Sequence, residues 1–319
     1  MKGGLLFPVQ PAGRKRIIAD FSLLITAVIW GANFTIIKQT LLEVPPMLFL
    51  GLRFLLAFLP LAPFLCAAGW RPASSVGWLQ GAVIGGLLFA GFAAQTLGLR
   101  YTTPGLSGFL TGIYVLLVPV LGILIQRRLP GRAAFTGAVL AACGLGLLSW
   151  HGQTGFGPGA LLTLAGALFF ALHFWALGCW SAGLHPLFLT AVQMLVTGVC
   201  SLLLALFTEP VRMHFSLFGW GGIVYGAFLG SLGAYFIQTW AQRFTPPGRA
   251  AVLLSTESVF AALFSICLGM ETVTPGKILG FAFIFAGILV AELFAPEGEP
   301  SPPPGRKGKA GGAGGEKPV

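Results

Sequence analysis

The sequence contains very little charge. Only 9% of its 319 residues are Asp, Glu, Lys or Arg, whereas soluble globular proteins have about a quarter. Twelve of the 28 charged residues lie in the first twenty residues or after residue 295, so the long middle of the chain is nearly uncharged. With 56% apolar residues and a mean hydropathy of +0.87, this composition excludes a soluble protein and predicts one that crosses a membrane many times.

Cysteine is also scarce, and its spacing suits neither a metal nor a disulfide. The five cysteines lie in separate apolar segments without a CxxC pair, where they indicate packing. No HExxH motif and no pair of aspartates lies at membrane depth. We therefore expect no metal site, no cofactor and no catalytic residue, and an intramembrane enzyme is the least favoured function.

The net charge of +10 does not indicate nucleic-acid binding. The basic residues form short clusters between apolar segments, where positive charge orients a membrane protein. No basic stretch is long enough, or sufficiently interleaved with aromatic residues, for a nucleic-acid site. We expect the lipid bilayer, and no nucleic acid, as the surroundings of this chain.

Ten segments are long and apolar enough to span a membrane, which takes about 20 residues. Prolines near their starts suit the first turn of a helix, where a missing N–H costs nothing. The sequence thus predicts an all-α integral membrane protein with ten transmembrane helices. They are residues 21–42, 47–69, 77–99, 105–126, 133–150, 159–180, 186–207, 218–241, 249–269 and 275–295.

An internal repeat divides these ten segments into two groups of five. At an offset of 143, Gln95, Arg100, Thr102, Pro104, Gly105, Gly137 and Gly144 return as Gln238, Arg243, Thr245, Pro247, Gly248, Gly280 and Gly287. At an offset of 140, Trp30, Asn33, Pro46 and Arg53 match Phe170, His173, Pro186 and Gln193. Two units, 21–150 and 159–295, each with an odd number of spans, must be inverted relative to each other, which is typical of alternating-access transporters.

Charge predicts the orientation of the chain. With the N-terminus inside, the inner segments hold 14 Lys or Arg residues and the outer loops hold three. This bias predicts that both termini are cytoplasmic. The N-terminal segment 1–20 is then cytoplasmic, as is the tail 296–319, whose Pro, Gly and Lys content predicts disorder.

Polar side chains recur on one face of at least five predicted helices. A single stripe would fit hydrogen bonds between helices, but stripes on so many helices favour a shared water-accessible cavity. The residues expected to line its substrate path are Trp30, Asn33, Arg53, Gln95, Tyr114, His173, Gln193, Tyr235, Gln238 and Glu257.

Three of these residues leave alternatives open. The Arg53 guanidinium could orient a substrate carboxylate or could bond helix carbonyls. Glu257, the only acid deep inside a predicted span, could exchange a proton for substrate, bind a substrate ammonium group, or pair with a neighbouring donor. His173 could be a proton relay or a hydrogen-bonded packing residue. Its repeat partner is Asn33, and that of Glu257 is Tyr114, so both pairs break the internal symmetry.

Several motifs resemble the EamA-type family of the drug/metabolite transporter superfamily. In the first unit these are Trp30-Gly31-Ala32-Asn33-Phe34, Arg53-Phe54, Gln95-Thr96-Leu97-Gly98-Leu99-Arg100-Tyr101-Thr102, Ser107-Gly108-Phe109-Leu110-Thr111 and Val118-Pro119. In the second they are Ala171-Leu172-His173, Gln193, the stripe from Ala234 to Gln242, Ser255-Thr256-Glu257 and Gly269-Met270-Glu271. The resemblance implies a ten-helix inner-membrane carrier with a central cavity that moves amino acids, other small metabolites or toxic compounds. Ser258 departs from the family, whose members often carry proline there.

We therefore expect a secondary active transporter, and no enzyme, for a small polar or amphipathic metabolite. An amino-acid-like compound moving outward is the favoured substrate, with protons as a possible coupling ion through Glu257. A flippase for a lipid or a lipid-linked sugar is the alternative within the same fold class. The expected location is the inner cell membrane, as a monomer or homodimer.

Overall fold

A computed structural model of the chain describes residues 14–66, 75–126, 132–149, 157–210, 213–270 and 272–293. Within these ranges all regular structure is helical, with no strand. The segments 1–13 and 296–319, and with them the expected disordered tail, lie outside the described residues.

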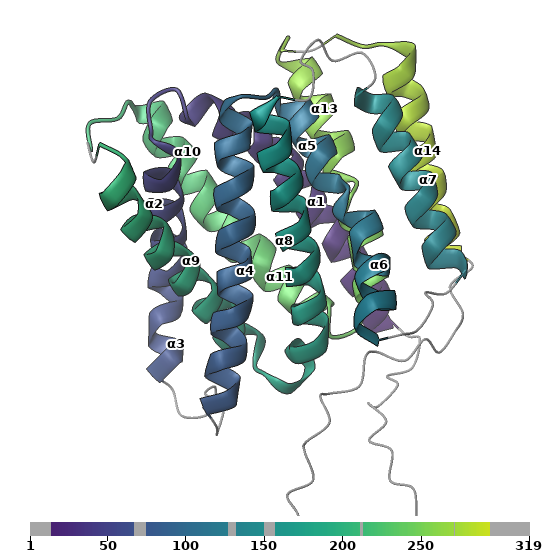
Figure 1. Cartoon of the computed structure of the whole chain (residues 1–319). Coiled ribbons are helices and arrows are strands. Elements are labelled where there is room, and N and C mark those ends of the chain that lie inside the picture. The colour runs from purple at the N-terminus through teal and green to yellow at the C-terminus, as the bar shows by residue number, and fades with distance from the viewer. Residues whose placement is uncertain are drawn as a thin grey trace, which may run out of the picture.

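The helices form a single bundle (Figure 1). Those of the first half are α1 (Arg14–Thr40), α2 (Pro46–Phe58), η1 (Leu59–Leu61), α3 (Ala62–Cys66), α4 (Ser75–Arg100), α5 (Pro104–Gly112), α6 (Tyr114–Gln126) and α7 (Arg132–Ser149). Those of the second half are α8 (Pro158–Trp180), η2 (Ser181–Gly183), α9 (Pro186–Thr208), α10 (Leu217–Ala227), η3 (Phe228–Gly233), α11 (Ala234–Ala241), α12 (Pro247–Leu254), α13 (Glu257–Cys267) and α14 (Pro275–Leu293). Six of them begin with proline: α2, α5, α8, α9, α12 and α14.

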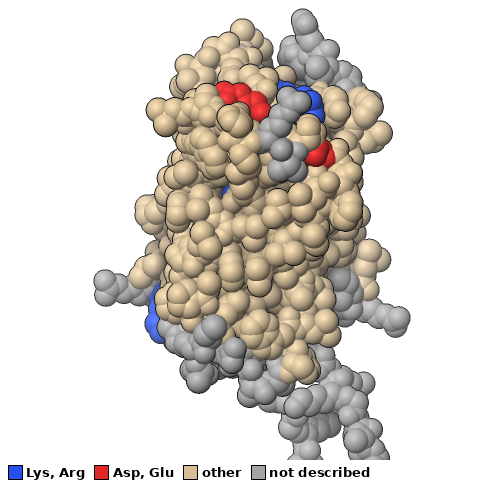
Figure 2. Space-filling model, turned by 90° about the vertical axis from the view of Figure 1, so that its left-hand side faces the viewer, with Lys and Arg blue, Asp and Glu red and all other residues tan. Residues whose placement is uncertain are grey.

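The described helices are those of a membrane protein. In their described residues, all ten predicted segments are mainly helical. Among the described residues, eight helical stretches are long and apolar enough to cross a membrane, and two shorter apolar helices, Phe135–Gly144 and Ile278–Gly287, lie within α7 and α14. Figure 2 shows the consequence on one face, where charged side chains lie mostly toward the two ends and the broad middle is uncharged.

Besides the span that contains the 3₁₀-helix η1 between α2 and α3, three of the predicted spans are interrupted rather than continuous. One breaks between α5 and α6 at Ile113, and another between α12 and α13 at Ser255 and Thr256. The Ser255 and Thr256 hydroxyls donate to the carbonyl oxygens of Val252 and Leu253, both at 2.7 Å, and such local bonds compete with the helical ladder. The third interruption is η3, a six-residue π-helix between α10 and α11.

Glycines bring α7 and α14 into close contact, side by side in Figure 1. A Cβ atom on Gly144 would lie 2.5 Å from the Gly280 carbonyl oxygen, and one on Gly287 would lie 2.6 Å from that of Gly137. These four residues are the repeat partners 137/280 and 144/287, so exchanging the two repeat units turns the first contact into the second. Only glycine permits backbones to approach so closely.

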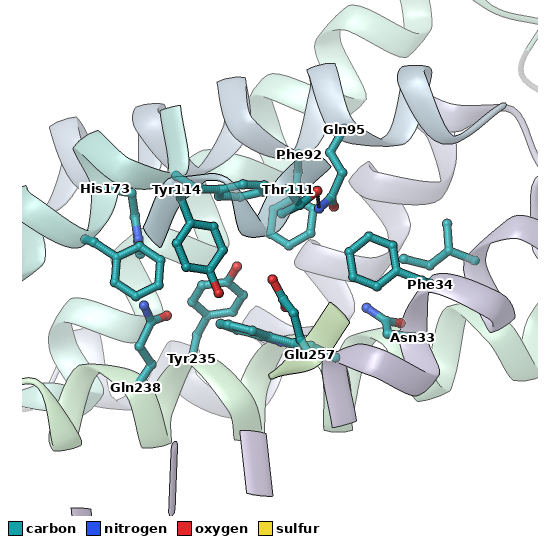
Figure 3. A pocket seen from close by; sticks show the side chains of 14 residues that line it. Asn33, Phe34, Phe92, Gln95, Thr111, Tyr114, His173, Tyr235, Gln238 and Glu257 are labelled. Atoms are coloured by element: carbon teal, nitrogen blue, oxygen red, sulfur yellow. Dashed lines mark hydrogen bonds between the residues drawn. The ribbon is translucent and has the colours of Figure 1, made fainter. Parts of the chain in front are cut away.

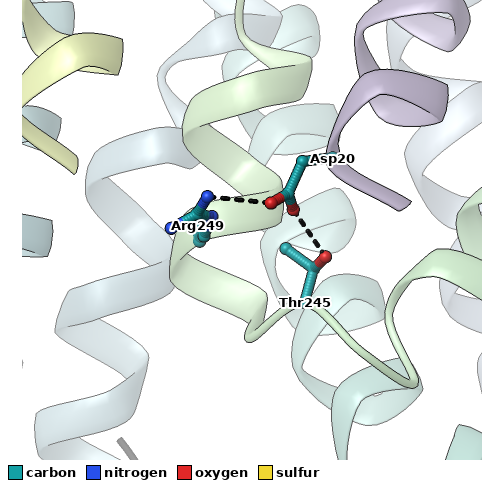
Figure 4. Close-up of polar contacts among 3 residues, drawn as sticks. All are labelled: Asp20, Thr245 and Arg249. Atoms are coloured by element: carbon teal, nitrogen blue, oxygen red, sulfur yellow. Dashed lines mark hydrogen bonds and ion pairs between the residues drawn. The ribbon is translucent and has the colours of Figure 1, made fainter. Parts of the chain in front are cut away.

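Polar contacts tie α1 to the second half at both of its ends. Near its start, Asp20 accepts a hydrogen bond from the Thr245 hydroxyl at 2.7 Å and forms an ion pair with Arg249 at 2.8 Å (Figure 4). Just beyond its end, the Glu43 carboxylate accepts hydrogen bonds from the Ser216 N–H at 2.9 Å and hydroxyl at 2.8 Å. At 1.5 Å per residue, the two ties are about 30 Å apart.

Lys38, in the last turn of α1, binds the end of another helix. Its ammonium group donates to the carbonyl oxygens of Leu99, Arg100 and Thr102 at 2.8–3.1 Å. These acceptors lie at and beyond the C-terminus of α4, where free carbonyls and the helix dipole favour a cation. Lys38 therefore joins α1 to α4 and is not among the residues of the central cavity described below.

Candidate functional site: a central cavity

A cavity lies in the middle of the bundle, between helices of both halves. Its volume is ≈ 30 Å³, room for about two water molecules rather than a metabolite. A substrate can therefore enter only if wall side chains move. The lining residues come from α1, α4, α5, α6, α8, α11 and α13: Trp30, Asn33, Phe34, Ile37, Phe92, Gln95, Thr111, Tyr114, Phe170, His173, Phe174, Tyr235, Gln238 and Glu257.

Glu257 is the only Asp or Glu among these lining residues. It is the first residue of α13, immediately after the break at Ser255 and Thr256. A carboxylate is stabilised at the N-terminus of a helix because of the helix dipole and the free N–H groups there. Glu257 thus begins a helix in the cavity wall with only 4% of its surface exposed.

Ser258 stabilises this arrangement from the adjacent position. Its hydroxyl donates to the Gly108 carbonyl oxygen at 2.8 Å and so joins the start of α13 to α5. Proline has no side-chain donor for this bond. The serine that departs from the family pattern thus makes a contact between the two interrupted spans.

Tyr114 occupies the corresponding place in the first half. It is the first residue of α6, after the break at Ile113, just as Glu257 is the first residue of α13 after its own break. In Figure 3 the hydroxyls of Tyr114 and Tyr235 and the Glu257 carboxyl point toward one another, and the buried Tyr114 hydroxyl has no hydrogen-bond partner among the described residues. The two interrupted spans therefore bring their repeat-matched residues to one point in the cavity.

Aromatic rings form most of the remaining wall. Tyr235 lies at its centre, with ring centroids 5.1 Å from Trp30, 5.9 Å from His173 and 6.0 Å from Phe92. Phe92 continues the wall to Phe170 at 5.2 Å. Tyr114 stacks on Phe174 at 4.9 Å. Such a wall offers polarisable faces that can attract a cation.

His173 is held from behind by Gln193. The His173 Nε2 lies 2.8 Å from the Gln193 side-chain oxygen. The Gln193 amide nitrogen donates to the Leu189 carbonyl oxygen at 3.2 Å, which orients the amide with its oxygen toward the histidine. Because that oxygen can only accept, neutral His173 carries its proton on Nε2. Gln193 fixes the histidine without lining the cavity itself.

The other polar residues of the wall differ in whether their side chains have hydrogen-bond partners. The Gln95 amide nitrogen donates to the Thr111 hydroxyl at 2.9 Å. In contrast, both polar side-chain atoms of Gln238, and the side-chain oxygen of Asn33, are buried without a hydrogen-bond partner among the described residues. Buried groups of this kind are rare, so these two amides are candidates for contact with water or a ligand.

Arg53 lies behind the cavity wall and is fully buried. Its Nε donates to the Ser231 hydroxyl at 2.7 Å and the Gly226 carbonyl oxygen at 3.1 Å, and its Nη2 donates to the Gly230 carbonyl oxygen at 3.0 Å. These acceptors lie in or next to the π-helix η3. The guanidinium also lies 4.8 Å from the centroid of Phe92, whose ring stands in the cavity wall.

Eight of the ten residues predicted to share a cavity line this one, and the other two, Arg53 and Gln193, stand behind it. Sequence reasoning did not select Phe34, Ile37, Phe92, Thr111, Phe170 and Phe174 for the cavity. Two signals for them were present in the sequence, since Thr111 belongs to the Ser107-to-Thr111 motif and Phe170 is the repeat partner of Trp30. Within the described ranges no group of three His, Cys, Asp or Glu residues could hold a metal ion.

Comparisons with known proteins place this architecture among transporters. The model of a family described as "EamA-like transporter family" matches residues 17–150 and again 157–293. An uncharacterized transporter of Archaeoglobus fulgidus is 33% identical over 281 residues, covering 88% of each chain. A "probable amino-acid metabolite efflux pump" of Salmonella typhimurium is 28% identical, covering 85% of this chain and 93% of that protein.

Two further comparisons agree. The uncharacterized inner membrane transporter YedA of Escherichia coli (strain K12) is 27% identical, over 82% of this chain and 87% of that protein. A solved crystal structure that is 20% identical superposes with a TM-score of 0.72, covering 88% of this chain and 98% of the other. At that identity, the structural likeness supports the fold alone.

Proposed function

Because the chain belongs to the EamA-like transporter family, we propose that it is a secondary transporter that moves a small polar or amphipathic metabolite by alternating access. The observation that carries this proposal is the buried carboxyl group of Glu257, in a cavity where two interrupted spans meet. Interrupted helices near the middle of the bilayer commonly form the substrate sites of such carriers.

The proposed architecture is ten transmembrane helices in two inverted repeats, 21–150 and 159–295. The reciprocal glycine contacts of α7 and α14 support this symmetry. So do the matched breaks before Tyr114 and Glu257, which are 143 residues apart. The excess of Lys and Arg in alternate loops supports an inner-membrane orientation with both termini in the cytoplasm.

We propose that the polar contacts of Asp20 and of Glu43, at the two ends of α1, close the two ends of the substrate path. Alternating access requires each end to open while the other is closed. Asp20 with Thr245 and Arg249 closes the cytoplasmic end, and Glu43 with Ser216 closes the outer end. Both ties cross between the two halves, as closures between rocking repeats must.

The proposed substrate is an amino-acid-like compound, moved outward. The name of the Salmonella relative supports this choice. We further propose that Glu257 exchanges a proton for substrate, because the described wall offers no other carboxyl group. The proposed residues of the substrate path are the eight predicted residues in the wall, with Arg53 and Gln193 supporting them.

Transport by purified protein in liposomes tests this function. Vesicles with an imposed pH gradient should accumulate a labelled amino-acid-like substrate, and the Glu257→Gln variant should retain exchange of substrate for substrate but lose accumulation. Glu299→Gln, the same change in the C-terminal segment 296–319, serves as the control. Equal pH-driven accumulation by Glu257→Gln removes the proton role, and absence of any flux across a metabolite panel removes the transport function.

A further inference from the structure

The described wall of the cavity contains an acidic side chain but no Lys or Arg side chain. Among the described residues of its wall there is one carboxyl group, that of Glu257, and no Lys or Arg. The Arg53 guanidinium is fully buried behind the Phe92 ring, where its Nε and Nη2 donate to three oxygen acceptors and its Nη1 has no hydrogen-bond partner among the described residues. The Lys38 ammonium group donates to three carbonyl oxygens at the end of α4. A bound carboxylate would therefore find no cation in this wall.

The surroundings of Glu257 suit a positive ligand. The tyrosines Tyr114 and Tyr235 present their hydroxyls next to its carboxyl group (Figure 3). The Tyr235 ring is also the centre of the aromatic wall, with Trp30 and Phe92 within 6.0 Å of it. An ammonium group near an aromatic face and a desolvated carboxylate is attracted by both.

Uncharged polar groups lie in the same wall. Gln238 is fully buried and neither its oxygen nor its nitrogen has a hydrogen-bond partner among the described residues, and the Asn33 oxygen is in the same situation. Primary amides both donate and accept, so they match a neutral amide, ester or hydroxyl of a ligand. Side-chain amides carry no charge to balance a carboxylate.

From these three features we propose that the substrate is an amine whose carboxyl group is absent or blocked, such as an amino-acid amide or ester, rather than a free amino acid. The ammonium group binds Glu257 within the aromatic wall, and the neutral polar group binds Gln238 and Asn33. This inference rests on the proposed transport function, because it names the substrate class of the same cavity.

Four compounds that share the phenylalanine side chain test the contributions of the ammonium group and the carboxylate separately. Phenylalaninamide has a free ammonium group and a blocked carboxyl, phenylalanine has both groups free, N-acetylphenylalanine has only the carboxylate, and N-acetylphenylalaninamide has neither charge. Binding of each to purified protein, measured by calorimetry near neutral pH, should place phenylalaninamide at least tenfold tighter than the other three. Glu257→Gln should reduce that affinity at least tenfold, whereas Glu299→Gln, the same change in the C-terminal segment 296–319, should leave it unchanged.

Any other order of the four binding affinities overturns the inference. Tighter binding of phenylalanine would show that a cationic side chain binds its carboxylate, and Arg53, behind Phe92, is the candidate. Equal binding of the uncharged compound, or no binding of phenylalaninamide, removes the role of the ammonium group. Glu257→Asp and the melting temperature of each variant separate loss of binding from loss of folding.

The failure of this inference differs from the failure of the proposed function. Flux of phenylalanine in liposomes together with weak binding of phenylalaninamide leaves the transporter intact and removes the amine. Tight, Glu257-dependent binding of phenylalaninamide without flux of any compound supports the amine site and removes transport.

Discussion

Trp30 and Arg53 donate hydrogen bonds to the same atom, the Gly230 carbonyl oxygen, each at 3.0 Å. Trp30 belongs to the cavity wall and Arg53 does not. Gly230 lies within the π-helix η3, and π-helical turns are frequent at functional sites. Through this one oxygen, the buried arginine on α2 positions the wall residue on α1.

Replacing Arg53 should therefore destabilise the bundle and displace the wall. Arg53→Lys keeps the charge but loses the planar fork that reaches three acceptors, so we expect unfolding to become easier by about 3 kcal/mol. Denaturant unfolding in detergent measures this, and Trp30 fluorescence in a background with the other tryptophans replaced reports the wall. Arg100→Lys, at an exposed site, is the matched control. Equal stability of the two variants would contradict the positioning role.

Gly31 should tolerate no side chain. A Cβ atom there would collide with the Phe260 Cβ and would lie 2.9 Å from both the Ala261 nitrogen and the Glu257 carbonyl oxygen. Gly31→Ala should push α1 away from α13 and destabilise the protein by about 1–3 kcal/mol. Gly221→Ala, where a Cβ meets nothing within 4 Å, is the control and should melt like the parent protein. A Gly31→Ala variant with unchanged melting and transport would refute this packing.

Gln193 should determine the protonated nitrogen of His173. In the parent protein we expect the Nε2–H form, because the Gln193 oxygen accepts from that nitrogen. Gln193→Leu removes the acceptor, so both neutral forms should become populated, and ¹⁵N chemical shifts of labelled histidine report this. Thr239→Val, which removes only the long 3.4 Å contact to the Gln193 amide, should leave the shifts unchanged. A parent spectrum with the proton on Nδ1 would contradict the arrangement.

The Asp20 contacts should favour closure of their end of the path. Asp20→Asn weakens the ion pair with Arg249, so a cysteine-reactive probe should label introduced cysteines near that end several-fold faster. A double-mutant cycle with Arg249→Gln isolates the pair, which should couple by about 1.5–3 kcal/mol because the hydrogen-bonded charged side chains are only 12% and 11% exposed. Additive effects of the two substitutions would show that the pair does not act as a unit.

The hydrogen bonds between Glu43 and Ser216 should be lost in acid. Hydrogen bonds from the backbone N–H and the hydroxyl of Ser216 lower the pKa of the Glu43 carboxyl group below its usual value. Because the pKa is lowered in the folded protein, the stabilisation by these hydrogen bonds is fully present above the ordinary pKa of about 4.3. It is lost as the pH falls through the lower pKa of the folded state. Hydrogen exchange of the Ser216 amide, corrected for intrinsic rates, should lose protection in that range. In Glu43→Gln, protection should not change with pH, and an unchanged profile in the parent protein would contradict this tie.

The sequence predicted helical segments and a shared cavity because both depend on local or periodic patterns. Apolar runs separated by prolines indicate where helices begin, and polar residues spaced three or four apart indicate a common face. Trp30, Asn33, Tyr235 and Gln238 were predicted in this way, and all line the cavity. The role of each residue in transport remains a prediction.

What the sequence could not determine was which polar residues face the cavity and which support it. Arg53 and Gln193 are polar residues inside predicted spans, as the wall residues are, and only the packing of α2 against η3 and the contact of Gln193 with His173 show that they stand behind the wall. The π-helix η3, which with Gly226 supplies acceptors to Arg53, packs against α1, α2 and α9.

The sequence by itself determined the membrane environment, the helical segments and the repeat, because apolar length, proline position and residue identity are properties of the chain. The tertiary structure decided that Tyr114 and Glu257 meet at two helix breaks, and that the wall of the cavity carries an acid without a basic partner. Those features depend on distances between residues far apart in the sequence, which are determined only when the helices pack.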